Sequence, residues 1–183
     1  LDFFAPETHF NIQGTVDKLY YTTYRLAGYD LAATLENHQL DAALTAKNSA
    51  MELEAHLDAK LKPNDVAAHL TVLVPKLDWQ SMKLIDKPFR TSHTFDVSFV
   101  SDLEQRYVVD ASMTDTSVKA PKKTFKTKDV YVGFATSADS TRAYMRAGDL
   151  DVDFEGRGYV ENILQQFDAF TTRAGEQWTT KTI

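Results

Sequence analysis

The sequence predicts a mainly β fold: a long antiparallel meander that curls into a groove like a half-pipe, with one amphipathic helix near its carboxyl end. Three observations support this prediction. Apolar and polar residues alternate between Leu40 and Val74 with a period of two, which is the periodicity of a β-strand. Short turn-forming segments interrupt the alternation, and the apolar residues on either side of each turn still fall on one face. The period becomes helical only near residue 160.

Three turns allow the strand register to be tested. We take Asn37-His38 and Asn48-Ser49 as two-residue loops and residues 62–65 as the next turn. Each turn then sets one apolar residue opposite another, and the pairs are Leu35 with Leu40, Ala46 with Met51 and Leu61 with Val66. One face of the predicted sheet is therefore apolar and the other polar, and the apolar face requires a cover or a ligand.

An earlier hairpin turns at Thr22-Thr23 and sets Val16 opposite Tyr29. The phase of its apolar residues reverses on both strands near the tip, which predicts a bend near Gly28. The apolar tip residues either pack on a neighbouring segment or form a docking surface, and they are Leu19, Tyr20, Tyr21 and Tyr24.

We expect a single fragment of a repetitive β-groove with five segments: a first meander over 1–74, a connector over 75–92, a second meander over 93–158, a helix over 159–172 and a tail over 173–183. Pro75 is expected to end its strand, because proline cannot donate to the hydrogen-bond ladder. A β-bulge is expected at Gly148, where the apolar phase shifts. The helix is expected to cover the apolar face as a lid, through Ile163, Leu164, Phe167 and Phe170.

Composition excludes several classes of function. The chain has 183 residues and a net charge of −6, which argues against a nucleic-acid partner. It has no cysteine, so disulfides, a zinc-thiolate site and a cysteine nucleophile are excluded. No apolar run approaches the roughly 20 residues of a membrane-spanning helix, and no signal peptide opens the chain. Because the chain starts at Leu1 and stops at Ile183 without a natural ending, we expect a fragment of a longer protein, with any anchor outside it.

The sequence contains no catalytic or cofactor motif: it lacks a nucleophile elbow, a phosphate-binding loop and a dinucleotide fingerprint. His56 and His69 lie on adjacent strands of the polar face beside Asp58, without the spacing of metal ligands, so we expect a solvated charge pattern. The alternating acidic residues lack the glycine turn of a calcium loop, and they are Asp149, Asp151 and Asp153. We therefore expect no enzyme, no catalytic residue, no metal and no cofactor.

One stretch is strongly basic within this acidic chain and contains Lys119, Lys122, Lys123, Lys126 and Lys128. Two interpretations remain open. Lysines on the edge of a sheet block edge-to-edge pairing. They also suit contact with phosphate headgroups or an acidic partner.

A recurring strand pattern with a few fixed glycines and tyrosines covers most of residues 8–172. Its segments are Gly14 to Tyr21, Tyr24 to Leu26, Asp30 to Leu35, Leu40 to Leu44, Met51 to Ala55, and Asp139 to Gly156 leading into the helix at Val160. These segments resemble the TamB proteins, large envelope proteins of Gram-negative bacteria related to AsmA. The resemblance implies a slice of a long periplasmic β-groove, anchored at the inner membrane outside this chain and reaching toward an outer-membrane barrel assembly protein. It also implies a non-catalytic role in phospholipid movement between the membranes and in outer-membrane assembly.

We therefore expect a groove that shields or conducts phospholipid acyl chains. Exposure of each CH₂ group of such a chain to water costs about 0.8 kcal/mol of free energy. The wall of the groove is expected to contain Leu40, Leu44, Met51, Leu53, Leu57, Leu61, Leu70, Val72, Val74, Phe95, Val97 and Phe99. The alternative is a closed β-sandwich or barrel that acts as a spacer or a protein-docking scaffold in the envelope. A ligand carrier of the lipocalin type would need a polar cluster inside the apolar face, and the predicted register gives none.

Overall fold

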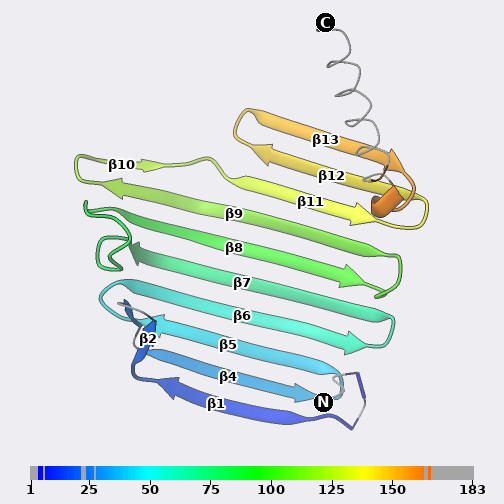
Figure 1. The fold of residues 1–183 in the computed structure, drawn as a ribbon, viewed down its shortest axis with the longest axis horizontal. Helices are drawn as coiled ribbons and strands as arrows, with labels where there is room; N and C mark the ends of the chain where they lie inside the picture. Colours follow the sequence, from blue (N-terminus) through cyan, green and yellow to red (C-terminus); the bar gives the residue numbers. More distant parts are fainter. Residues whose placement is uncertain (1–3, 6, 22–23, 27, 163–164, 166–183) are drawn as a thin grey trace, which may run out of the picture.

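The alternating segments form one open antiparallel sheet in the computed structural model, which describes residues 4–5, 7–21, 24–26, 28–162 and 165. Ten strands follow one another across this sheet (Figure 1). They are β1 (Phe10–Val16), β4 (Tyr29–Glu36), β5 (Gln39–Lys47), β6 (Met51–Lys62), β7 (Asp65–Asp78), β8 (Arg90–Ser101), β9 (Tyr107–Ala120), β11 (Val130–Thr136), β12 (Ser140–Ala147) and β13 (Leu150–Arg157). β10 (Lys123–Lys126) pairs with β9 beside this path, and β2 (Leu19–Tyr21) pairs with β3 (Tyr24–Leu26) in a separate small sheet.

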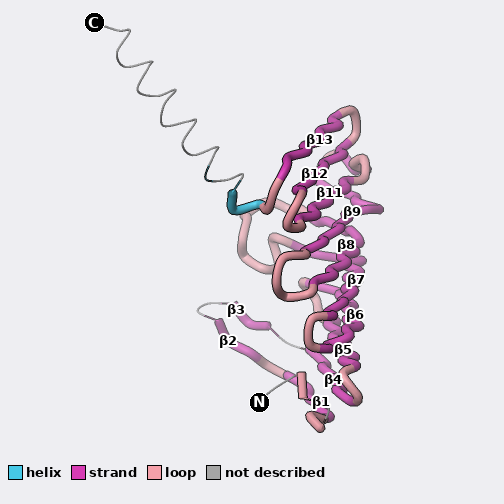
Figure 2. Tube along the Cα trace, turned by 90° about the vertical axis from the view of Figure 1, so that its right-hand side faces the viewer, coloured by secondary structure: helices cyan, strands magenta, loops and turns pink. Residues whose placement is uncertain are grey.

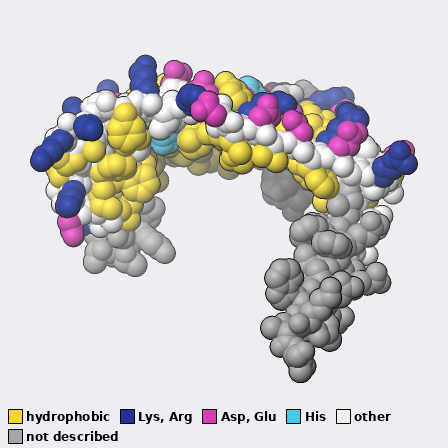
Figure 3. All heavy atoms as spheres, turned by 90° about the horizontal axis from the view of Figure 1, so that it is seen from above, with side chains coloured by type: hydrophobic (Ala, Val, Ile, Leu, Met, Phe, Trp, Pro, Cys, Tyr) yellow, Lys and Arg dark blue, Asp and Glu magenta, His cyan; other side chains and the backbone are white. Residues whose placement is uncertain are grey.

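The sheet is a single curved layer. Figure 3 shows the molecule as an arch, with hydrophobic side chains along the concave side and charged side chains along the convex side. Nine strand spacings of about 4.8 Å make the sheet roughly 43 Å wide across the strands. The strands β1 and β13 are its two edges and do not pair with each other. The predicted groove-shaped, mainly β fold is therefore confirmed, and the sheet is not closed into a barrel.

Two of the three test turns have the predicted register. Asn37 and His38 both adopt positive φ angles, 50° and 64°, as the tight hairpin turn requires, and Leu35 pairs with Leu40. At the turn over 62–65, Asn64 has a φ of 57°, and Leu61 pairs with Val66.

The predicted register at Asn48 is wrong by two residues. Ala46 pairs with Leu53 instead of Met51. The reason is that the Asn48 side chain accepts hydrogen bonds from the backbone amides of Ala50 and Met51, both at 2.9 Å, and so holds a longer turn. A shift of two residues keeps the same side chains on the same face, so the apolar face is unchanged.

The prediction that Pro75 ends its strand is also wrong. β7 continues to Asp78, because the strand contains an extra residue around Pro75, between Leu73 and Lys76 relative to β6 and between Val74 and Leu77 relative to β8. A bulge leaves one residue unpaired, so the missing N–H of proline is tolerated there. A second bulge lies in β9 opposite His93, where Asp115 has a φ of 53°. The two meanders are therefore joined by pairing of β7 with β8, and the connector shrinks to residues 79–89.

The predicted bulge at Gly148 is instead a hairpin turn. Ala147 pairs with Leu150, and Gly148 takes a φ of 65° between them. Across a two-residue turn the apolar residues change from odd to even numbers, as they also do across a bulge. The sequence pattern is therefore the same for a turn and for a bulge.

The predicted bend near Gly28 is present. Val16 pairs with Tyr29, after which β2 and β3 leave the main sheet, and they lie on the same side of it as the start of the carboxyl-terminal helix (Figure 2). Gly28 has a φ of 71°, and a Cβ atom there would lie 2.9 Å from the carbonyl oxygen of Lys47. Glycine therefore allows both the left-handed backbone and the close approach of β5.

Few side chains are buried, because the described part of the chain has no second layer of strands over the concave face. Its buried hydrophobic residues are Leu35, Ala46, Ala59, Val66, Val74 and Val118. A short helix begins at Val160, whose amide donates to Thr136 Oγ1 at 3.2 Å. The predicted lid residues Ile163, Leu164, Phe167 and Phe170 lie outside the described residues, as does the tail.

Candidate functional site

The concave face contains three unbroken rows of apolar residues, each crossing all ten strands of the sheet path. The middle row is Ile12, Ala33, Ala42, Leu57, Leu70, Val97, Ala111, Val132, Met145 and Val152. The row on one side is Phe10, Leu35, Leu40, Ala59, Ala68, Phe99, Val109, Phe134, Ala143 and Phe154. The row on the other side is Gly14, Leu31, Leu44, Ala55, Val72, Phe95, Met113, Val130, Ala147 and Leu150. No charged or hydrogen-bonding side chain interrupts these rows, which we call the apolar trough.

Much of the trough is exposed, although Leu35 and Ala59 in one of its rows are buried. Near its edges, Leu31 is 44% exposed, Met145 40% and Phe154 47%. In the middle, Leu57, Leu70 and Val97 are half-buried and pair with neighbours in their own sheet. An exposed apolar surface of this extent is uncommon in proteins that bind nothing there, and it marks an interaction surface.

The register places all twelve predicted wall residues on the concave face. Eight of them stand in the three rows, and Met51, Leu53, Leu61 and Val74 stand beside the rows. The prediction omitted the outer strands, whose exposed members include Ile12, Leu31, Val132, Met145, Val152 and Phe154. The same alternation was present there, in residues 10–16 and 130–154, and could have identified them.

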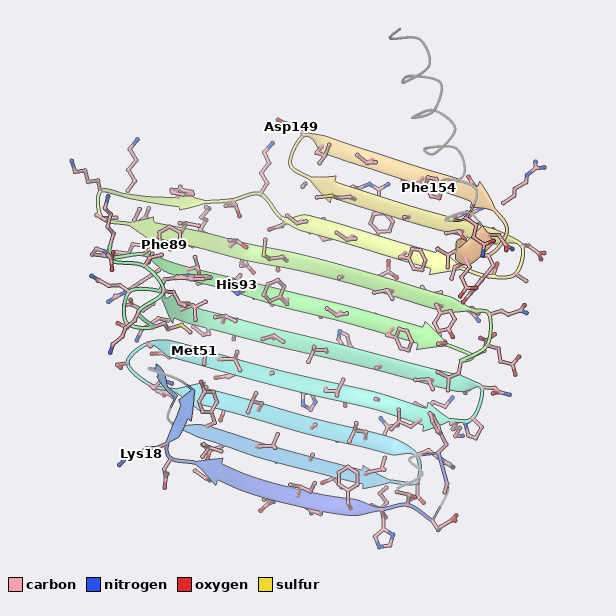
Figure 4. All side chains as sticks on the ribbon, viewed as in Figure 1. Lys18, Met51, Phe89, His93, Asp149 and Phe154 are labelled. Atoms are coloured by element: carbon pink, nitrogen blue, oxygen red, sulfur yellow. The ribbon has the colours of Figure 1, made fainter. Side chains whose placement is uncertain are left out.

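A cluster of ring side chains lies at one end of the strands, where Figure 4 labels Phe89 and His93. The Trp79 indole donates from Nε1 to Thr91 Oγ1 at 3.0 Å and meets the Phe89 ring edge-on at 6.4 Å. His93 meets the Phe95 ring at 4.7 Å, and burial lowers the pKa of the His93 imidazole. The imidazole is therefore neutral near pH 7, and His93 adds no charge to the trough.

Two histidines of the polar face contact carboxylates on the convex side. His69 Nε2 lies 2.9 Å from Asp96 Oδ2, and His56 contacts Asp58 at 3.2 Å and Asp41 at 3.9 Å. One ligand atom from each of Asp41, His56 and Asp58 lies within 4.8 Å of the others. All of these side chains are about half exposed, as expected for a solvated charge pattern, and exposed pairs of this kind contribute little to stability.

Fold and face together define an open β-groove with an apolar wall. Neither a family model, nor a curated protein, nor a solved structure matches the chain, so the resemblance to the TamB proteins stays a prediction. Among the described residues, no helix has the length and apolar character needed to cross a membrane.

Proposed function

We propose that the chain is a non-enzymatic groove module that shields or conducts phospholipid acyl chains. The observation that carries this proposal is the apolar trough, which crosses ten strands without a polar interruption. By its sequence resemblance, we place the module in the periplasm, as part of an inner-membrane-anchored protein that supports outer-membrane assembly.

The physical basis is the transfer of alkyl groups out of water. Each CH₂ that leaves water contributes about 0.8 kcal/mol, so a chain of about 15 methylenes gains roughly 12 kcal/mol if fully covered. A half-pipe covers only part of each chain, which lowers this gain and lets the chain slide instead of being held at one position. Uniform apolar rows suit sliding, because no hydrogen bond must be broken at any step.

The proposal can be tested by photocrosslinking with a photoreactive amino acid in place of Leu53, and in place of Glu54 as the control. These neighbours lie on opposite faces of β6, Leu53 half-buried on the concave face and Glu54 exposed on the convex face. In cells, we expect phospholipid adducts at Leu53 and few at Glu54. Protein adducts alone at Leu53 would favour a docking scaffold and contradict the proposal.

A further inference from the structure

The two rims of the trough, which are the two ends of the strands, carry opposite charge. At one end lie the connector after β7, the segment around β10 and the turn after β12, and the charged residues there are Asp78, Lys83, Asp86, Lys87, Arg90, Asp115, Lys119, Lys122, Lys123, Lys126, Lys128, Asp129 and Asp149, with more lysines than any other charged residue. We call this the basic rim. The turns of the opposite end carry Glu36, Lys62, Asp65, Asp102, Glu104, Arg106, Asp139, Glu155, Arg157 and Glu161. A chain with a net charge of −6 thus concentrates much of its positive charge at one end of its strands.

Most lysines of the basic rim have no carboxylate partner. Among the described residues, the ion pairs of this rim are Arg90 with Asp78 at 2.7 Å and Lys128 with Asp149 at 2.7 Å. The remaining six lysines are exposed and outside any ion pair of the described residues, and they are Lys83, Lys87, Lys119, Lys122, Lys123 and Lys126. Several basic side chains elsewhere on the sheet do have carboxylate partners: Lys60 contacts Asp65, and Arg146 contacts both Asp151 and Asp153. The basic rim is therefore free to bind an anion.

The basic rim is continuous with the apolar trough. Phe125 on β10 pairs with Val118 on β9. Successive pairs across the sheet then join Val118 to Thr91, Leu77 and Met51, so all of these residues lie on the same face of the sheet. Phe125 therefore stands on the concave side, where it is 50% exposed. Lys123, two residues earlier, pairs with Ala120 and stands on the same side. The ammonium group of Lys123 thus lies next to the apolar surface. A lipid with an anionic headgroup beside its acyl chains would fit this arrangement.

Exposed apolar residues also accompany the lysines of the connector. Leu84 is 47% exposed and Ile85 is 38% exposed, and both lie between Lys83 and Lys87. Protection of a sheet edge does not explain these lysines, because the connector is not an edge strand.

We propose that the basic rim binds the phosphate of an anionic phospholipid whose acyl chains lie in the apolar trough. This inference rests on the proposed function and adds the headgroup class and the position of the headgroup. The ammonium groups of Lys122 and Lys123 meet the phosphate, and the chains run from Phe125 over the apolar rows. Lysine is a strong point charge for phosphate, and such contacts weaken as salt is raised.

The test compares short-chain phosphatidylglycerol with phosphatidylcholine of equal acyl length, each titrated into the purified chain by calorimetry. The variant is K122Q/K123Q, and the matched control is K62Q/R106Q, which removes the same charge at exposed basic residues of the opposite end of the strands. We expect the wild type to bind phosphatidylglycerol more tightly, and K122Q/K123Q to lose roughly 10–30-fold of that affinity. The control is expected to retain it. The loss in K122Q/K123Q is expected to be smaller for phosphatidylcholine, because its choline cation offsets the charge of the phosphate.

Each other outcome overturns the inference in a distinguishable way. Equal binding of both lipids by the wild type, or an unchanged preference in K122Q/K123Q, overturns the headgroup site and leaves the groove function standing. Inorganic phosphate that binds the rim as tightly as phosphatidylglycerol identifies a free-anion site and overturns the lipid assignment. Failure of both lipids to bind overturns the groove function together with the headgroup site.

Discussion

Truncation of two leucines on β4 tests whether the trough is open in solution. Leu31 and Leu35 lie four residues apart on the same face, but Leu31 is 44% exposed whereas Leu35 is 1% exposed. Full burial of a leucine side chain contributes about 1.5–3 kcal/mol, so Leu31→Ala, with roughly half of that burial to lose, is expected to lower the free energy of unfolding by about 1 kcal/mol. Leu35→Ala also leaves a cavity and is expected to lower it by about 2–5 kcal/mol.

Urea unfolding of the whole chain, followed by circular dichroism, measures both changes from the shift of the midpoint at a common slope. The ratio of the two losses matters more than either value, because both variants share one strand and one denatured state. Equal losses above about 2 kcal/mol would mean that Leu31 is as buried as Leu35 in solution. The trough would then be sealed, and the interpretation of an open groove would be refuted.

Four further substitutions test local features of the fold by the same unfolding assay. Asn48→Ala removes two hydrogen bonds that backbone amides donate to the side chain, and it is expected to lower the free energy of unfolding by about 1–2 kcal/mol. An unchanged stability would show that the Asn48 side chain does not hold the longer turn. Gly28→Ala is expected to lower the free energy of unfolding by about 1–3 kcal/mol, because Gly28 has a φ of 71° and the new Cβ would lie 2.9 Å from a carbonyl oxygen. Gly14→Ala is the control and is expected to be neutral or stabilising, because nothing lies within 4 Å of its new Cβ. A larger loss in Gly14→Ala than in Gly28→Ala would contradict the bend. Hydrogen bonds from the Ser81 backbone and the Arg90 guanidinium hold the pKa of the buried Asp78 carboxyl below its usual value, so its contribution is present above about pH 4 and is lost as the pH falls through the lowered pKa. The difference in stability between Asp78→Asn and the wild type is therefore expected to shrink as the pH falls below about 4, and a difference that does not change with pH would contradict this.

The apolar face could be predicted from the sequence because its signal is redundant. Parity alone decides which face a side chain joins, so the error of two residues at Asn48 moved no side chain across the sheet. The features that could not be predicted depend on single local choices. Pro75 sits in a bulge that only the pairing of β7 with both neighbours reveals, and Gly148 in a turn that mimics the parity change of a bulge.

The candidate site was predicted in part for the same reason. Strand alternation identified the wall in β5 to β8, and the same alternation in the outer strands could have extended it to residues such as Ile12 and Val152. The basic rim shows the limit more clearly. Lys119 to Lys128 were visible as a charged run, but their position beside Lys83 and Lys87 at one end of the trough follows from the pairing of β7, β8, β9 and β10.

The central claim is that the concave face is open and takes up acyl chains, and thiol protection tests it most directly. The chain contains no cysteine, so Val132→Cys and Tyr131→Cys each introduce a unique thiol. These neighbours on β11 are matched in exposure, 42% and 43%, and lie on opposite faces, Val132 in the middle row of the trough and Tyr131 on the convex side. We predict that a water-soluble maleimide modifies both variants without lipid, and that phospholipid slows the reaction only in V132C. A V132C thiol that resists maleimide without lipid, or that lipid fails to protect, would contradict the claim.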